Sequence, residues 1–286
     1  MATPLSLGIP SWLGVSLVLS IFGLLLAVLV IVRRKWNVHP EVPRKCAHVV
    51  MGLLLLALPW LFDSVLPATV LAILSIMSLL LLRWAACRNC EVGRILHWSA
   101  QRRRSIGDLS FPVSVLALFY LASDEPLLYC LPILYLTLSD SMACLVGMRY
   151  STSKPGAKSM EGSIAFFLTT FLLTLAGMLA YAGAALAPAV LVALIMGSSL
   201  TIVEAIAFRG LDNLTVPLAG YLVLNCTMAW DSSRLIPLTG LCVLVACGSQ
   251  LWQLWTKDTS GPMVRIERFM TFVFSESGGD GSRRLL

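Results

Sequence analysis

The sequence predicts an all-α fold, a polytopic bundle of transmembrane helices, on three observations. Hydrophobic residues make up 58% of the 286 residues and charged residues only 13%. The mean hydropathy of +0.85 is higher than a soluble domain with a polar exterior sustains. The apolar residues also gather in nine runs, so we expect about nine membrane spans, with seven to nine compatible with the pattern.

Several of the nine runs are slightly shorter than the about 20 residues that one helical crossing takes, so tilted, half-inserted or merged spans stay open. The runs cover residues 12–32, 47–62, 66–83, 109–122, 127–147, 163–183, 187–208, 214–230 and 235–255. The first run has no small-residue cleavage site before Arg33, and we interpret it as a retained helix rather than a removed signal.

The basic residues predict the orientation of these helices. With the runs numbered in order, the connections after the odd-numbered runs and the C-terminal tail hold twenty of the twenty-one Lys and Arg residues, and Arg234 is the exception. Because Lys and Arg in short loops stay cytoplasmic, we expect the N-terminus outside and the C-terminus in the cytoplasm. The sequence does not specify which membrane holds the protein.

One integral membrane domain accounts for residues 1–262, since no soluble domain or linker separates from the runs. In residues 263–286, the stretch from Met263 to Phe274 alternates charged with apolar residues, which suits a helix at the membrane interface, and the tail after it is expected to be disordered. The net charge of +6 indicates contact with anionic lipids at the cytoplasmic face, and no pattern indicates a nucleic-acid partner.

Three acidic residues lie in or beside the apolar runs near the predicted cytoplasmic face: Asp140, Glu204 and Asp212. A carboxylate in a bilayer segment is costly, so its default interpretation is a functional one. Counted back from the end of the fifth run, Asp140 lies about 10 Å below the surface. Carboxylates at one depth suit Mg²⁺ that also bridges substrate phosphates. For Glu204, a solvated or paired interfacial residue near Arg209 is the alternative.

The connection after the fifth run has the composition of an anion-binding loop. Arg149, Lys154 and Lys158 stand among hydroxyl residues and a Pro-Gly turn, and Lys158-Ser159 directly precedes the sixth run. Unpaired backbone N–H groups and the positive end of a helix dipole favour phosphate at such a position. The alternative is a cytoplasmic loop in which Ser159 only caps the helix.

The second run opens with a basic segment that contains Arg44, Lys45 and His48. His48 follows Arg44 by four residues and therefore lies on the same face of the helix. These three side chains are candidates for contact with a substrate or its headgroup, and a structural role for His48 stays open.

Five motifs follow one another on the same membrane side between residues 40 and 220. They are Pro-Arg-Lys-x-x-His-x-x-x-Gly (43–52), Ser-Asp-x-x-Ala-x-x-x-Gly-x-x-Tyr (139–150), Lys-Ser-x-x-Gly-Ser (158–163), Glu204 and Asp-Asn-x-Thr-x-Pro (212–217). In this order they resemble the CTP-dependent polyprenol kinase family, which includes dolichol kinase, phytol kinase and the fungal CTP-dependent diacylglycerol kinase. A more distant similarity is to phosphatidate cytidylyltransferases.

The resemblance and the site chemistry together imply a membrane lipid kinase that transfers the terminal phosphate of CTP to the hydroxyl of an isoprenoid alcohol. They imply Mg²⁺ held by Asp140 and Asp212, with Glu204 orienting or deprotonating an alcohol that arrives laterally between helices. Lys158 is expected to be catalytic together with Asp140 and Glu204. The residues expected to contact the nucleotide are Ser139, Arg149, Lys158, Ser159, Gly162, Ser163, Asn213 and Thr215.

The chain also departs from the family pattern. Leu211 stands where the first of two acidic residues is usual, which leaves Asp212 as the only carboxylate of that pair and leaves the number of metal ions open. A CTP-dependent diacylglycerol kinase and a cytidylyltransferase that makes a CDP-lipid are the enzymatic alternatives. A transporter is the alternative without catalysis, and it would place its acidic residues near the bilayer midplane.

Overall fold

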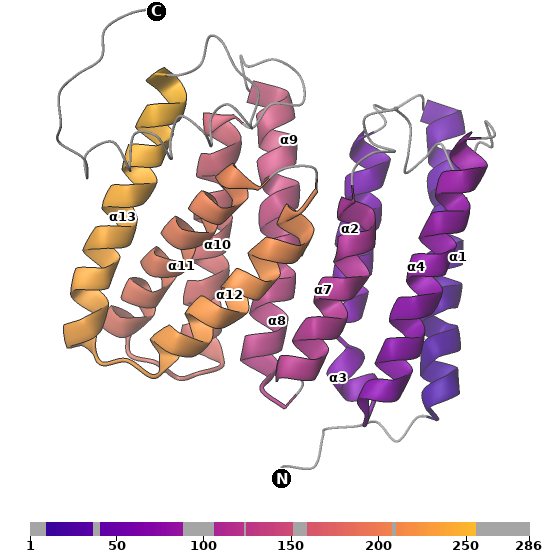
Figure 1. Ribbon diagram of the computed structural model, residues 1–286, viewed down its shortest axis with the longest axis horizontal. Helices are drawn as coiled ribbons and strands as arrows, with labels where there is room; N and C mark the ends of the chain where they lie inside the picture. The colour runs from indigo at the N-terminus through magenta and orange to yellow at the C-terminus, as the bar shows by residue number, and fades with distance from the viewer. Residues whose placement is uncertain are drawn as a thin grey trace, which may run out of the picture.

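The computed structural model describes residues 10–36, 41–87, 106–122, 124–150, 159–207 and 210–255, and every regular element in these ranges is a helix (Figure 1). This confirms the all-α class. The elements are α1 (Ser11–Trp36), α2 (Glu41–Leu55), α3 (Leu58–Leu61), α4 (Val65–Cys87), α7 (Gly107–Ala122), α8 (Pro126–Leu134), the π-helix η1 (Tyr135–Ser139), α9 (Asp140–Tyr150), α10 (Met160–Ala180), α11 (Leu186–Ile206), α12 (Asp212–Met228) and α13 (Ser232–Trp255).

Six segments of the described chain are long and apolar enough to cross a membrane. They are Ser11–Leu29, Val65–Trp84, Pro126–Tyr150, Met160–Ala180, Leu186–Ile206 and Ser232–Gln250. The third combines α8, η1 and α9 in one continuous rod. The three remaining predicted spans correspond to α2 with α3, to α7 and to α12, whose helices are shorter. The count of nine and the orientation therefore stay predictions.

The second predicted span is divided because of a proline. Helix α2 ends at Leu55, and α3 begins at Leu58 with Pro59 in its first turn. Proline lacks a backbone N–H and fits the first turn of a helix, where no intrahelical acceptor is needed, but not a helix interior. The apolar run of residues 47–62 is therefore two helices with a turn between them.

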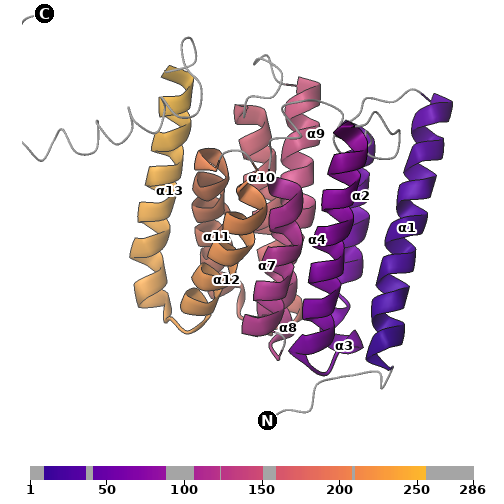
Figure 2. The same cartoon turned by 45° about the vertical axis from the view of Figure 1, so that its right-hand side comes forward.

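The helices stand side by side (Figures 1 and 2), with α1, α2 and α4 on one flank and α10, α11 and α13 on the other. Helices α7, α8, α9 and α12 lie between the flanks. The turns from α3 to α4, α7 to α8, α10 to α11 and α12 to α13 gather at the lower end in these views. The beginnings of α2, α7, α10 and α12, and the ends of α9 and α11, consequently share the upper end.

Two groups of buried apolar side chains hold the bundle together. One lies among α8 to α13 and includes Phe166 and Met196, and the other lies among α1 to α8 and includes Phe62 and Phe119. Large apolar side chains such as Leu66 and Leu244 stay exposed on the outer faces. An apolar exterior is the surface that hydrocarbon solvates, which is consistent with an integral membrane protein.

The predicted interfacial helix and tail of residues 263–286 lie outside the described residues. So do residues 88–105, which include five of the arginines that predict the orientation, and most of the predicted anion-binding loop, residues 151–158.

Candidate active site

Asp140 begins α9 at the point where the π-helix η1 ends. The backbone N–H of Asp140 donates to the carbonyl of Tyr135, five residues earlier, so the turn that carries the acidic residue is wider than an α-helical turn. Single π-helical turns inside longer helices occur frequently at functional sites. The π-helical turn therefore indicates a functional role for Asp140, the residue that the sequence already indicated by its charge.

The carboxylate of Asp140 pairs with Lys45 of α2, and the two residues are 95 positions apart in the chain. Lys45 Nζ lies 2.5 Å from Asp140 Oδ2 and also donates to the backbone carbonyl of Asp140 at 3.4 Å. The Lys45 side chain is 5% exposed and that of Asp140 is 15% exposed. A charge this deeply buried persists only with a partner of opposite charge, so each residue accounts for the burial of the other.

Close packing of α2 against η1 brings the pair together. A Cβ atom at Gly52 would overlap the side chain of Thr137, whose hydroxyl donates to the carbonyl of Ile133. Small residues let membrane helices approach closely. Gly52, the last residue of the Pro43–Gly52 motif, thus lets α2 approach η1 closely enough for Lys45 and His48 to reach Asp140.

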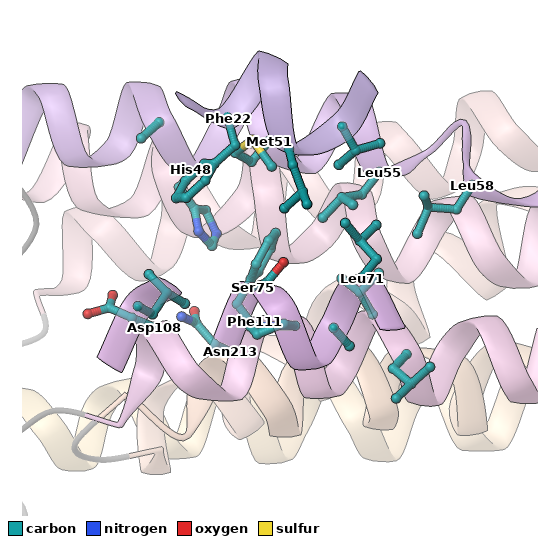
Figure 3. A pocket seen from close by; sticks show the side chains of 18 of the residues that line it. Phe22, His48, Met51, Leu55, Leu58, Leu71, Ser75, Asp108, Phe111 and Asn213 are labelled. Carbon is teal, nitrogen blue, oxygen red and sulfur yellow. The ribbon is translucent and has the colours of Figure 1, made fainter. Parts of the chain in front are cut away.

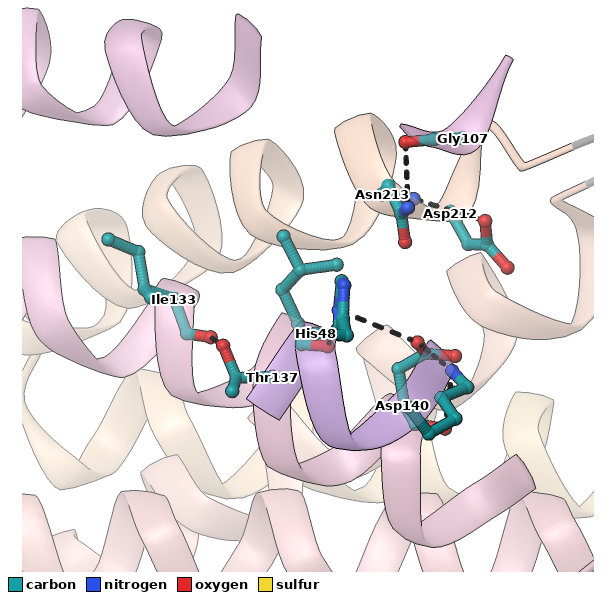
Figure 4. Close-up of polar contacts among 9 residues, drawn as sticks. His48, Gly107, Ile133, Thr137, Asp140, Asp212 and Asn213 are labelled. Carbon is teal, nitrogen blue, oxygen red and sulfur yellow. Dashed lines mark hydrogen bonds and ion pairs between the residues drawn. The ribbon is translucent and has the colours of Figure 1, made fainter. Parts of the chain in front are cut away.

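His48 completes this cluster (Figure 4). Its Nε2 lies 3.1 Å from the carbonyl oxygen of Leu136, which can only accept, and 3.9 Å from Asp140 Oδ2. The imidazole ring is tilted against the ring of Phe111 of α7 at a centroid distance of 4.8 Å. One edge of His48 is therefore fixed by polar contacts, and its face borders an aromatic side chain.

The start of α12 is tied to the start of α7. Asn213 is buried, and its amide Nδ2 donates to the carbonyl of Gly107 at 2.8 Å. The hydroxyl of Thr215 donates to the carbonyl of Leu211 at 3.0 Å. The side chains of Asn213 and Thr215 therefore make structural hydrogen bonds, which fix the start of α12 and with it Asp212. Figure 4 shows Asp212 and Asp140 toward the same end of the helices.

The three carboxylates lie on the same side of one helix contact. A Cβ atom at Gly220 of α12 would lie 3.1 Å from the Tyr135 ring and 3.5 Å from Leu200, so α12, η1 and α11 meet there. Measured along each helix at about 1.5 Å per residue, the backbones of Glu204, Asp140 and Asp212 lie about 6, 8 and 12 Å from this contact. All three acidic residues lie toward the upper end of the bundle.

The first turn of α10 packs tightly on α9. Ser159 caps α10 by accepting from the N–H of Gly162 at 3.1 Å, as one of the two interpretations of Ser159 expected. A Cβ atom at Gly162 would lie 2.8 Å from the carbonyl oxygen of Ala143, and one at Gly147 would lie 3.0 Å from the Ser159 hydroxyl. The motif glycine therefore places the N-terminus of α10 directly beside the helix of Asp140.

Three buried side-chain oxygens near this helix end have no hydrogen-bond partner in the described structure: Ser141 Oγ, Ser163 Oγ and Glu161 Oε2. Buried polar atoms without partners are rare and mark places where a ligand or water is expected. Ser163 was predicted to contact the nucleotide. Glu161 was not, because in the sequence it resembles an ordinary acidic residue in a first helical turn.

Ser139 has a different environment from its neighbour Asp140. It is fully buried and accepts a hydrogen bond of 2.9 Å from the hydroxyl of Thr170 on α10. Its predicted contact with the nucleotide would require this helix contact to open.

The other predicted site residues differ in how much the structure says about them. Glu204 is buried in the last turn of α11, Arg44 lies half-buried on α2, and Arg149 is exposed near the end of α9. Lys158 lies outside the described residues. Within the described part of the chain, no group of three or more His, Cys, Asp and Glu side chains is arranged to hold a metal ion by itself.

The chain is similar to the phytol kinase of Synechocystis sp., with 26% identity over 235 residues that cover 80% of this chain and 95% of that enzyme. No family model matches the chain. No solved structure matches it at a significant level. The similarity supports a relationship to phytol kinases and to isoprenoid alcohol kinases of the same kind. The links to dolichol kinase and to CDP-lipid synthesis stay predictions.

Proposed function

We propose that the protein is an integral membrane kinase that transfers the terminal phosphate of CTP to the hydroxyl of an isoprenoid alcohol. The proposal rests chiefly on the buried Lys45–Asp140–His48 cluster at one end of an apolar bundle. The similarity to a phytol kinase over most of the chain favours the alcohol as acceptor. The basic residues around this end favour a cytoplasmic site that soluble CTP can reach.

The acidic residues fit the binding of Mg²⁺ together with CTP, but not of a metal ion held by protein groups alone. Mg²⁺ commonly takes one or two carboxylates and completes its shell with substrate phosphates and water. Asp140 and Asp212, on segments that begin or end at the upper end of the bundle and contact each other, are the residues proposed to hold it. Lys45 would then orient Asp140 through its second contact, to the backbone carbonyl. When bound, the metal ion would neutralise charge on the phosphates.

The chain's own groups are assigned to charge neutralisation and alignment, because phosphoryl transfer depends mainly on these two effects. Lys158 and Arg149 are proposed to contact the phosphates beside the N-terminus of α10. The alcohol oxygen forms a bond to the γ-phosphorus while the bond from that phosphorus to the bridging oxygen breaks, and CDP leaves. The hydroxyl proton passes to a carboxylate, for which we propose Glu204.

The test uses purified protein in nanodiscs with Mg²⁺, a panel of isoprenoid alcohols and diacylglycerol, and CTP labelled either at the α- or at the γ-phosphate. A kinase transfers only the γ-label to lipid, and Asp140→Asn serves as the inactive control. Transfer of the α-label with release of pyrophosphate would show a cytidylyltransferase instead. A γ-label on diacylglycerol alone would replace the proposed acceptor, and no transfer with any lipid would refute the proposal.

A further inference from the structure

We propose that the cavity among α1, α2, α4 and α7 holds the hydrocarbon tail of the acceptor alcohol, with the hydroxyl directed toward His48. This inference rests on the proposed function and adds the position of the substrate to it. It identifies the residues that select the alcohol by chain length. Figure 3 shows the cavity with His48, Ser75 and Phe111 around it.

The cavity is apolar along most of its length. Its deeper wall is formed by aliphatic and aromatic side chains from four helices and by Leu58 of α3. These are mainly Phe22, Met51, Leu55, Leu71, Phe111 and Val115. An apolar lining with a few polar groups at one end is the usual form of a site for a greasy ligand.

The charged, imidazole and amide side chains of the lining gather at one end, the upper end in Figures 1 and 2. Arg44 and His48 from α2, Asp108 from α7 and Asn213 from α12 border the cavity there, and Figure 3 shows His48, Asp108 and Asn213 toward its left side. Asp108 also lies 3.8 Å from Arg83 of α4, which links the helices on two sides of this end. A ligand with one polar group on an apolar body fits this distribution in only one direction.

His48 connects the cavity with the acidic site. It borders the cavity, and its Nε2 is 3.9 Å from the Asp140 carboxylate. If the tail of an alcohol lies among the apolar residues, its hydroxyl lies beside His48. Only the His48 side chain then separates this hydroxyl from the Asp140 carboxylate. Such placement of two reactants is what a transfer between a soluble and a membrane-dissolved substrate requires.

The cavity is elongated along the helices. Its lining runs along α2 from Arg44 to Leu55 and along α4 from Ala68 to Leu79. Eleven residues of helix correspond to about 16 Å, so the lining is elongated along the helices, while the open space inside it is about 110 Å³. Ligand pockets usually have roughly 300 to 1,000 Å³, so the lining side chains must move apart to admit a whole tail. Residues halfway along the cavity should affect long alcohols more than short ones.

A groove between α1 and α4 offers a route from the bilayer. It is lined by Gly23 and Leu26 of α1 and by Leu81 and Trp84 of α4, among others, and it shares Leu19 and Phe22 with the cavity. A Cβ atom at Gly23 would meet no other atom within 4 Å. The substrate can thus enter sideways without crossing water.

The test compares substitutions at Ser75, which lines the middle of the cavity. Ser75→Leu fills space, while Ser75→Ala removes the hydroxyl without adding volume. Ile73→Phe adds bulk on the same helix at a side chain that is 54% exposed on the outer face. Turnover of the five-carbon alcohol 3-methyl-2-buten-1-ol and of the much longer geranylgeraniol is measured for each variant in nanodiscs.

With Ser75→Leu, we expect the KM for geranylgeraniol to rise about tenfold and that for 3-methyl-2-buten-1-ol about twofold or less, because only the longer tail extends past residue 75 and overfilling a packed space is penalised steeply. Ile73→Phe should keep the wild-type ratio, and Ser75→Ala shows how much of the change comes from loss of the hydroxyl rather than from added volume. An unchanged ratio in an active Ser75→Leu protein would overturn the cavity assignment and leave the proposed function standing. Wild-type protein that phosphorylates no alcohol would refute the proposed function instead.

A second measurement decides the cavity assignment without turnover. A farnesol analogue with a photoreactive group at its tail end is irradiated with the protein, and the labelled peptides are mapped. Adducts on Leu71, Phe111 or Val115 that decrease in Ser75→Leu are expected. Adducts elsewhere, or adducts that this substitution does not reduce, would overturn the assignment whether or not the protein is a kinase.

Discussion

Ser139 and Asp140 are consecutive residues, yet they belong to two regions of different chemistry. Ser139 faces α10, where its hydroxyl pairs with Thr170, and one turn earlier Tyr135 pairs with Thr174 at 2.7 Å. Asp140 faces α2, where it meets Lys45 and His48. The first region, which we call the hydroxyl seam, consists of Tyr135, Ser139, Thr170 and Thr174, and the second is the charged cluster of Lys45, His48 and Asp140.

The difference shows how to separate structural from functional polar residues in a membrane protein. In the hydroxyl seam, neutral groups satisfy one another, and such interhelical hydrogen bonds contribute on average about 0.6 kcal/mol each. In the charged cluster, a buried ion pair adds little or no stability over apolar residues of the same size. A gain in folding stability does not explain why the ion pair is present, so we assign a catalytic role to the charged cluster. The hydrogen bonds of the hydroxyl seam are explained by stability, and we assign no catalytic role to them.

The largest effect should come from Asp140→Asn in the charged cluster. The amide keeps a hydrogen-bond acceptor for Lys45 but loses the negative charge, so turnover should fall at least about a hundredfold. The protein should still fold, with a lower unfolding midpoint, because the buried Lys45 loses its counter-charge. The γ-label assay measures the loss, and thermal unfolding in detergent checks the fold. Near-normal activity would remove Asp140 from the proposed site.

The next largest effect should come from Lys45→Met, which leaves the Asp140 carboxylate buried without its cation. Breaking one side of a buried ion pair costs about 3 to 5 kcal/mol, so the unfolding midpoint should drop sharply and activity should fall as well. Adding Asp140→Asn to the same chain removes the unpaired charge. The double variant should regain most of the stability and none of the activity, and a double variant as unstable as Lys45→Met would contradict this explanation.

A smaller effect is expected from Gly52→Ala, which acts on the distance between α2 and η1. The added methyl group overlaps Thr137, and overpacking of this kind costs about 1 to 3 kcal/mol. Because Lys45 and His48 move with α2, turnover should decrease more than stability alone explains. Gly240→Ala is the matched control, since a Cβ atom there meets nothing within 4 Å. Equal behaviour of the two variants would show that the close approach is not needed.

The smallest effect is expected in the hydroxyl seam. Thr170→Val keeps the shape of the side chain and removes its hydrogen bond to Ser139, at a cost of about 0.6 to 1.7 kcal/mol. Turnover should stay within about twofold of wild type, since an interaction absent from the reacting groups does not change the barrier. A large loss of turnover with normal stability would support the sequence-based prediction that Ser139 contacts the nucleotide.

Much of the fold followed from hydropathy, because each apolar run needs only its own residues to become a helix. The run of residues 47–62 shows the limit, since one proline divides it into α2 and α3. Whether α7 and α12 each cross the membrane depends on length and tilt, which the runs specify only within a few residues.

The site was less predictable than the fold. Asp140 could be identified from the sequence, because a carboxylate in an apolar run is unusual whatever its partner is. Its partner could not, because Lys45 lies 95 residues away and in the sequence resembles a surface residue that contacts a headgroup. The role of Gly52 could not be predicted either, because a glycine is needed there only for the close contact with Thr137 on another helix. Pairings across helices are properties of the packing, and one sequence does not encode them as a local pattern.

The π-helical turn between Tyr135 and Ser139 has a consequence for the spacing of this chain. Each residue of a helix rotates its successor by about 100° around the axis, so shortening this stretch by one residue would turn all of α9 by that amount. The Asp140 side chain would then point toward a different helix, and Lys45 would lose its counter-ion. The number of residues in this helical turn, and not only their identity, therefore determines which helix Asp140 contacts.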